Sequence, residues 1–168
     1  MSNPTSKTPV TPAIRVLREA GVTYKEHQYP YVEKGGTAST SAALGVDEHE
    51  VVKTLVFEDD RDQPFIVLMH GDRNVSTKEL ARQLGVKRTA PCTPEKAQKH
   101  SGYMVGGTSP FGTRTALPVY VERTVLSLPR IFINGGHRGF ILEMNVQDLC
   151  RVVSPTPVDV AIPPLSPA

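Results

Sequence analysis

The sequence contains no tryptophan, and only five phenylalanines and five tyrosines among 168 residues. A groove that binds single-stranded nucleic acid by stacking successive bases needs more aromatic side chains than this, so the composition argues against a broad stacking platform. No apolar run approaches the length that crosses a bilayer. The N-terminus also lacks the apolar region of a secretory signal. These absences predict a cytoplasmic protein with no membrane partner.

Residue patterns that bind metals or phosphates are also missing. Cys92 and Cys150 are isolated and form no CxxC motif, so we expect reduced, structural thiols. The five histidines show no metal-ligand spacing, and there is no HExxH motif. A GxxxxGK[ST] loop, a GxGxxG turn after a strand and a GxSxG elbow are absent too. The sequence therefore predicts no metal site.

Charge is nearly balanced overall but unevenly distributed along the chain. The formal net charge is +2, yet residues 71–138 contain 11 Lys/Arg and four Asp/Glu. A basic central half indicates a polyanionic partner. The alternative is a surface on which charges that are separate in sequence mix in space.

The order of helix and strand signals predicts the fold class. Thr11-Pro12 and Thr93-Pro94 are typical helix starts, because Thr caps the helix and Pro fits its first position. Strand-like segments are expected at residues 22–29, 51–57, 64–70, 118–122, 130–134 and 140–144. Several of them are joined by short turns. We predict an α+β (mixed α/β) fold with a central mixed, mostly antiparallel, barrel-like sheet and flanking helices.

A chain of this length most simply forms one domain, which we place at residues 10–153. Residues 1–9 are expected to be a loose leader. Residues 154–168 contain five prolines and are expected to be a tail without regular structure.

Lys53 lies within a near-continuous apolar strand, residues 51–57. A buried ammonium is costly unless it meets an anion or a solvent-filled cleft. The alternative is a lysine that extends to solvent from the start of an edge strand. Tyr29, at the end of an earlier strand, could likewise reach into a cleft or pack at a rim. Lys53 is the most informative single residue.

Two glycine-rich segments complete the candidate site. Residues 102–112 read GYMVGGTSPFG: an apolar run of strand character stops at a glycine pair, and Pro110 stiffens the turn that follows. Glycine permits positive φ and close approach to bare backbone, so this loop should present N–H groups to a carbonyl, phosphate or carboxylate. An ordinary tight connection between strands is the alternative. Residues 134–139, NGGHRG, form a hairpin turn in which His137 and Arg138 are candidate phosphate contacts.

Three motifs, VKTL at 52–55 together with the segments 102–112 and 134–139, stand in the order and spacing of the YbaK family. The chain resembles this family over about residues 10–153. Its members are free-standing aminoacyl-tRNA deacylases related to the editing insertion of bacterial prolyl-tRNA synthetases. The resemblance implies hydrolysis of the ester that joins a wrong amino acid to a tRNA, typically the tRNA for proline. It implies the aminoacyl-tRNA 3′ end as a partner, prolyl-tRNA synthetase in a ternary complex, and neither a metal nor an organic cofactor.

The resemblance also implies roles for individual residues. Lys53 matches the essential lysine that holds the tRNA 3′ end and orients the ester. Gly106 and Gly107 match the loop that binds the aminoacyl group through its backbone, and we assign them with Lys53 to catalysis. The substrate-binding positions are Tyr29, Thr54, Thr108, Ser109, Asn134, Gly135 and Arg138.

Two positions depart from the cysteinyl-specific members of the family. Asn134 stands where Ser is expected, and Ile141 stands where an acid is expected. The amino acid removed is therefore open among Cys, Ala, Ser, Thr and other small residues. The candidate site shows no obvious general base, so a substrate thiol or a positioned water would attack. The alternatives are a non-catalytic module that binds tRNA or prolyl-tRNA synthetase, and a tRNA-independent hydrolase of a small ester.

Overall fold

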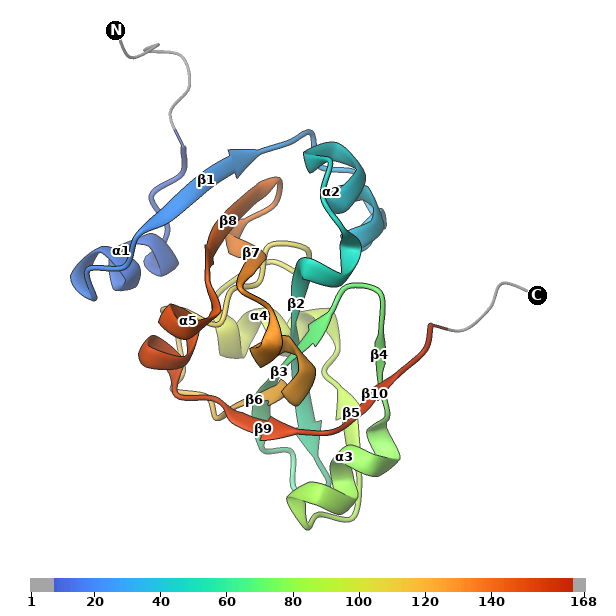
Figure 1. Ribbon diagram of the computed structural model, residues 1–168. Coiled ribbons are helices and arrows are strands. Elements are labelled where there is room, and N and C mark those ends of the chain that lie inside the picture. The colour runs from blue at the N-terminus through green and yellow to red at the C-terminus, as the bar shows by residue number, and fades with distance from the viewer. Residues whose placement is uncertain (1–7, 165–168) are drawn as a thin grey trace, which may run out of the picture.

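The computed structural model describes residues 8–164 (Figure 1). The elements in chain order are α1 (Pro12–Glu19), β1 (Tyr24–Gln28), α2 (Gly36–Leu44), η1 (Glu48–Glu50), β2 (Val51–Asp59), β3 (Pro64–His70), β4 (Asn74–Val75), α3 (Thr77–Leu84), β5 (Thr89–Pro91), α4 (Pro94–Ser101), β6 (Val119–Glu122), η2 (Arg123–Ser127), β7 (Arg130–His137), β8 (Phe140–Asn145), α5 (Val146–Val153), β9 (Thr156–Val158) and β10 (Ala161–Ile162). None of the helices within residues 8–164 is long and apolar enough to cross a membrane.

Most strands belong to one mixed sheet with the order β1-β8-β7-β2-β3-β6-β9, to which β5 adds by pairing with β2. The pairs β1/β8, β7/β8, β2/β3 and β2/β5 are antiparallel, and β2/β7, β3/β6 and β6/β9 are parallel. The predicted mixed, mostly antiparallel sheet with flanking helices is confirmed. No ladder within the described residues joins β1 to β9, so the sheet curves without closing. A separate pair, β4 with β10, completes the strands.

The ladder between β2 and β7 contains few residue pairs, and the candidate site lies where this ladder ends. The two strands pair only through Val51 with Phe132 and Val52 with Ile133. Lys53 and Asn134 are the next residues on each strand, and the register of β7 shifts between Asn134 and His137. The two strands therefore part where Lys53 and Asn134 begin, and those two side chains lie at the opening.

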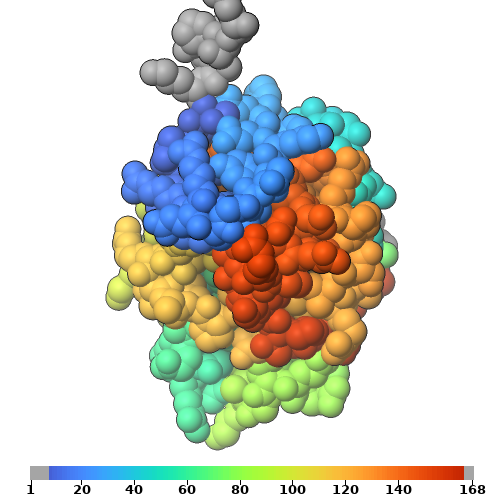
Figure 2. Space-filling model, turned by 60° about the vertical axis from the view of Figure 1, so that its left-hand side comes forward, coloured from blue at the N-terminus to red at the C-terminus, as the bar shows by residue number. Residues whose placement is uncertain are grey.

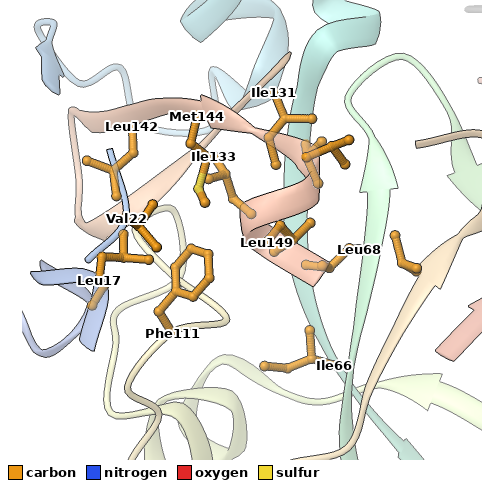
Figure 3. Packing of buried hydrophobic residues seen from close by; sticks show 14 of the residues in the cluster. Leu17, Val22, Ile66, Leu68, Phe111, Ile131, Ile133, Leu142, Met144 and Leu149 are labelled. Atoms are coloured by element: carbon orange, nitrogen blue, oxygen red, sulfur yellow. The ribbon is translucent and has the colours of Figure 1, made fainter. Parts of the chain in front are cut away.

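Two apolar clusters cover opposite faces of the central strands. Ile66 and Leu68 face the larger cluster, which is completed by α1, α5 and Phe111 (Figure 3). Val67 and Met69 alternate with them and face a smaller cluster that includes Leu80 of α3. Burying one such side chain fully contributes about 1.5–3 kcal/mol. This two-sided burial explains why residues 64–70 show a continuous apolar run instead of strict alternation.

The helix starts follow the sequence signals. Thr11 caps α1 by accepting a hydrogen bond from the Ile14 N–H, with Pro12 in the first turn. The Thr11 hydroxyl also donates to the Gly135 carbonyl at 2.5 Å, which ties α1 to the irregular part of β7. The α1–β1 segment, blue in Figure 2, lies against the orange-red β8–α5 part of the chain, as the β1/β8 ladder requires.

The C-terminal segment differs from our expectation of a loose tail. Its residues 154–164 include β9, which extends the main sheet, and β10, which pairs with β4. The buried Glu122 carboxylate accepts hydrogen bonds from the backbone N–H groups of Val160 (2.8 Å) and Ala161 (2.9 Å). These two backbone donors of the proline-rich segment are therefore bonded. The prediction is therefore wrong for residues 154–164. The expectations for residues 1–7 and 165–168 fall outside the described residues.

Candidate active site

A cleft of about 680 Å³ lies where β2 and β7 part. Its walls come from β2, from the segment 29–40 with the start of α2, from the loop 105–108, and from the beginnings of α3 and α4. This volume falls in the range of small-molecule sites in proteins. Segments that are distant in sequence therefore meet around one hollow.

Lys53 projects into this cleft from β2 and is partly buried. Among the described residues its ammonium has no hydrogen bond and no ion pair within 4.0 Å. Burial lowers the pKa of Lys53, and the nearby Glu48 and Asp72 carboxylates oppose this shift. A partly desolvated and unpaired ammonium is a group that gains when an anionic or carbonyl oxygen enters the cleft.

The two carboxylates that oppose the shift are held in place by neighbours. Glu48 accepts a hydrogen bond from the Thr37 hydroxyl at 2.7 Å. Asp72 bonds to His49 Nδ1 at 2.8 Å. Since both carboxylates are already bonded, they favour the charged form of Lys53 from a distance without neutralising it directly.

Two oxygens beside Lys53 have no partner. Thr54 Oγ1 and Asn134 Oδ1 are buried and make no hydrogen bond within the described chain, and both residues line the cleft. Leaving a buried polar atom unpaired costs about 1–3 kcal/mol. A ligand that donates hydrogen bonds to these oxygens recovers that free energy, so they mark a binding position beside the lysine.

The glycine pair contributes unequally to the opposite wall. Gly106 lines the cleft with φ +96°, and a Cβ there would lie 2.5 Å from the Tyr31 hydroxyl. The N–H groups of Gly106 and Thr108 have no partner in the part of the chain that the structure describes. The Gly107 N–H donates to the Met104 carbonyl at 2.9 Å, and Gly107 packs off the cleft. Gly106 and Thr108 therefore bring unpaired amides to the lining of the cleft, whereas Gly107 does not.

The apolar run that precedes the glycine pair, residues 103–105, forms no strand, contrary to the strand character that we predicted. The helix α4 ends at Ser101, and Gly102 reverses the chain in the left-handed region. Tyr103 is buried and its hydroxyl donates to the Phe111 carbonyl at 2.6 Å. Its apolar character thus reflects packing inside the loop and not sheet pairing.

The other predicted site residues fall into two groups. Tyr29 and Thr108 line the cleft, and the Tyr29 hydroxyl bonds to Thr40 Oγ1 at 2.8 Å. Ser109 is fully buried, with its hydroxyl oxygen accepting the Phe111 N–H, and Gly135 packs under the Phe140 ring. Ser109 and Gly135 lie away from the cleft, so their contacts shape the loops.

Two further predicted positions lie beside the cleft. Arg138 lines a smaller hollow that adjoins it. Ile141 is buried in an apolar cluster with Val51 and Phe132, so it presents no group to the cleft.

Several lining residues were not identified from the sequence. Tyr31 and Val32 follow Tyr29 on the wall, and Thr37 and Thr40 lie on α2. The spacing of Tyr29 and Tyr31 around Pro30 was an available signal. The far end of the cleft is apolar and includes Cys92. Secondary-structure propensities do not indicate that these residues line a cleft.

The described part of the lining offers no carboxylate or imidazole that could act as a general base. None of the described residues that line the cleft is Asp, Glu or His. Burial raises the pKa of the Cys92 thiol to about 11, so this group stays protonated at neutral pH. The arrangement can polarise a carbonyl between an ammonium and backbone amides, while the attacking group must come from the ligand or from water.

A separate cluster brings together His49, His70 and Asp72, whose ligand-type atoms lie within 4.8 Å of one another. The two imidazole rings are stacked, with centroids 3.7 Å apart and planes 9° apart. Lone pairs in parallel ring planes do not converge on one ion. Both ring nitrogens of His70 are bonded, to the His49 carbonyl and to Thr124 Oγ1. This geometry suits a hydrogen-bonded support for Asp72 better than a metal ligand set.

Comparison with known proteins agrees with this geometry. Residues 33–152 match the family described as the aminoacyl-tRNA editing domain. The chain is 27% identical over 135 residues to EbsC of Enterococcus faecalis, named as a candidate Cys-tRNA(Pro)/Cys-tRNA(Cys) deacylase, covering 80% of this chain and 82% of EbsC. It is 34% identical over 108 residues to the proline–tRNA ligase of Nitratidesulfovibrio vulgaris (strain DP4), which is 64% of this chain but 17% of the ligase.

Solved structures show the same fold. A crystal structure described as a candidate trans-editing enzyme for prolyl-tRNA synthetase superposes with a TM-score of 0.76 at 20% identity, covering 92% of this chain and 99% of that one. At this identity the likeness concerns the fold alone. Since the match of residues 33–152 spans most of the sequence, the chain belongs to the aminoacyl-tRNA editing domain family.

Proposed function

We propose that this protein is a trans-editing hydrolase that cleaves the ester of mischarged aminoacyl-tRNA, with tRNA for proline carrying Cys, Ala or another small amino acid as its substrate. The observation that carries the proposal is Lys53: a partly buried ammonium without a protein partner among the described residues, in the cleft that also exposes the Gly106 amide. Family membership and the name of the relative EbsC support the same activity.

The proposed chemistry assigns two sets of contacts to the substrate. Lys53 and the free amides of Gly106 and Thr108 stabilise the negative charge that develops on the ester carbonyl oxygen. Thr54 Oγ1 and Asn134 Oδ1 accept hydrogen bonds from the ammonium of the aminoacyl group. Both sets of contacts orient the carbonyl carbon for attack.

The attacking group comes from outside the protein side chains. With a cysteinyl ester the substrate thiol adds to its own carbonyl carbon, and the cyclic thiolactone that forms is then opened by water to give free cysteine. With an alanyl ester a water adds, oriented by backbone and by the ribose hydroxyl of the tRNA. In both cases the bond from the carbonyl carbon to the ribose oxygen breaks, and that oxygen takes up the proton that the nucleophile releases. This route is consistent with a lining free of carboxylate and imidazole.

The test is a deacylation panel. Proline tRNA charged separately with Ala, Cys, Ser, Thr or Pro is incubated with the protein, and loss of the amino acid is followed over time. We expect rapid loss of at least one small amino acid and persistence of Pro. Lys53→Met should slow turnover by about 10²- to 10³-fold, whereas Lys78→Met, at an exposed lysine of α3, should not. Persistence of all four mischarged substrates at protein concentrations well above the tRNA would overturn the proposal.

The missing general base also favours a second candidate, a non-catalytic module that binds tRNA or prolyl-tRNA synthetase. This candidate predicts salt-sensitive tRNA binding with no deacylation in the same panel. Under the first proposal, cytoplasmic prolyl-tRNA synthetase and the tRNA form a ternary complex with the protein. Co-sedimentation of the purified components, with and without tRNA, tests that partnership.

A further inference from the structure

A second hollow of about 350 Å³ adjoins the cleft. His137 and Arg138 line it, and Tyr29 lines both this hollow and the cleft. A chain molecule whose end occupies the cleft therefore passes Tyr29 and meets the cationic side chain of Arg138 next.

Arg138 is held in one orientation and is not neutralised. Its Nε donates to the Val105 carbonyl at 2.9 Å, and its guanidinium carbon lies 4.9 Å from the centre of the Tyr31 ring. Among the described residues no carboxylate lies within ion-pair distance of it. The N–H groups at its two terminal nitrogens are therefore available to a ligand, in the paired geometry that fits a phosphate.

Arg130 provides a natural contrast in the same molecule. Its guanidinium also lies over an aromatic ring, that of Phe132, at 5.1 Å. Its nitrogens, however, bond to the carboxylates of Glu50 (3.2 Å) and Glu143 (3.3 Å). The two arginines share a ring contact, with Arg130 exposed and Arg138 partly exposed, and they differ in whether a carboxylate already pairs with the guanidinium.

Exposed apolar side chains gather at the mouth of the cleft near Arg138. Five large hydrophobic side chains are strongly exposed within the described chain, and three of them, Val32, Met104 and Val105, belong to this region. Val32 and Val105 line the cleft itself. Apolar surface beside a free guanidinium matches a nucleotide, which combines a flat base and a sugar with a phosphate.

We propose that the hollow at Arg138 is a phosphodiester subsite, which binds one of the last two backbone phosphates of an RNA 3′ end whose terminal nucleotide enters the cleft. This proposal rests on the function proposed above. The Val105 carbonyl that orients Arg138 immediately precedes Gly106, which lines the cleft. The phosphate contact thus also sets where the ester lies relative to Gly106.

Binding of an uncharged RNA hairpin that ends in single-stranded CCA tests the subsite, measured by fluorescence anisotropy across salt concentrations. We expect Arg138→Ala to weaken binding about 5- to 20-fold, and to reduce the slope of log K against log salt by about 0.7, as for loss of one phosphate contact on a single strand. Arg138→Lys should fall between, because it keeps the charge but not the paired donors. Arg130→Ala should stay within about twofold of the wild type. Equal effects of Arg138→Ala and Arg130→Ala would overturn the proposal.

A second measurement does not depend on a variant folding correctly. Hairpins with a neutral methylphosphonate at the last or second-last linkage should bind the wild-type protein more weakly at one of these positions. The Arg138→Ala variant should bind that modified hairpin no more weakly than it binds the unmodified one. No loss at either linkage refutes the subsite. If the RNA contact is present but the charged-tRNA panel shows no deacylation, the subsite stands and the proposed hydrolysis falls. If deacylation proceeds but Arg138→Ala changes neither RNA binding nor KM, the proposed hydrolysis stands and the subsite falls.

Discussion

Replacing Lys53 by methionine should change stability and activity in opposite directions. Methionine keeps the apolar stem of the side chain and removes the ammonium. That ammonium has no partner within the described chain, and burial lowers its pKa, so the folded state accommodates the charge less well than the unfolded chain does. We expect Lys53→Met to leave the free energy of unfolding unchanged or to raise it by up to about 1 kcal/mol, as replacements at functional sites commonly do.

Deacylation by the same variant should fall by about 10²- to 10³-fold, or about 3–4 kcal/mol, the usual effect of removing one donor to a developing oxyanion. Urea unfolding and single-turnover deacylation measure the two quantities on one preparation. Lys78→Met controls for loss of a positive charge, since that lysine is exposed and its replacement should shift stability by less than about 0.5 kcal/mol. A Lys53→Met protein that is destabilised by more than 1 kcal/mol, or that keeps activity within threefold, would show that the lysine serves the fold and not the ligand.

Gly106→Ala and Gly85→Ala both place a side chain at positive φ, +96° and +71°, and each should cost about 1–2 kcal/mol in urea unfolding. Only Gly106→Ala pushes against the Tyr31 hydroxyl and should slow deacylation; equal activity of the two variants would contradict this. Burial lowers the pKa of His70, so the unfolded chain takes up a proton more readily below about pH 6.5, and the free energy of unfolding should fall between pH 6.5 and 5. An NMR titration giving a folded pKa at or above 6.5 would refute this. The Cys92 thiol, with a pKa of about 11, should react slowly with maleimide at pH 7.5, and Cys92→Ser should keep deacylation within about threefold; rapid labelling or lost activity would contradict the assignment.

Local signals predicted most of the elements. The Thr11-Pro12 start gives α1 and the Thr93-Pro94 start gives α4, because both depend on chemistry within four residues. The tail beyond residue 153 could not be placed in this way. Its strands are held by the Glu122 carboxylate and by pairing with β6 and β4, and those contacts come from distant parts of the chain.

The candidate site shows the same division between local and long-range information. Lys53 was identifiable because a charge inside an apolar strand needs an explanation, and glycine at position 106 permits the positive φ found there. That Gly107 and Ser109 pack away from the cleft depends on their contacts with the 137–138 turn and with Phe111. The unpaired state of Asn134 Oδ1 likewise depends on the local parting of β7 from β2, which no sequence pattern encodes.

The brief pairing of β2 with β7 has a consequence for how such chains diversify. One wall of the cavity is anchored in the strands on the β7 side of the sheet and the other in those on the β2 side. Only two residue pairs join β2 to β7. A slight rotation of one group against the other widens or narrows the entrance while every remaining ladder stays intact. Under the proposed function, selectivity for the acylated end can thus drift through distant packing changes, with Lys53 left untouched.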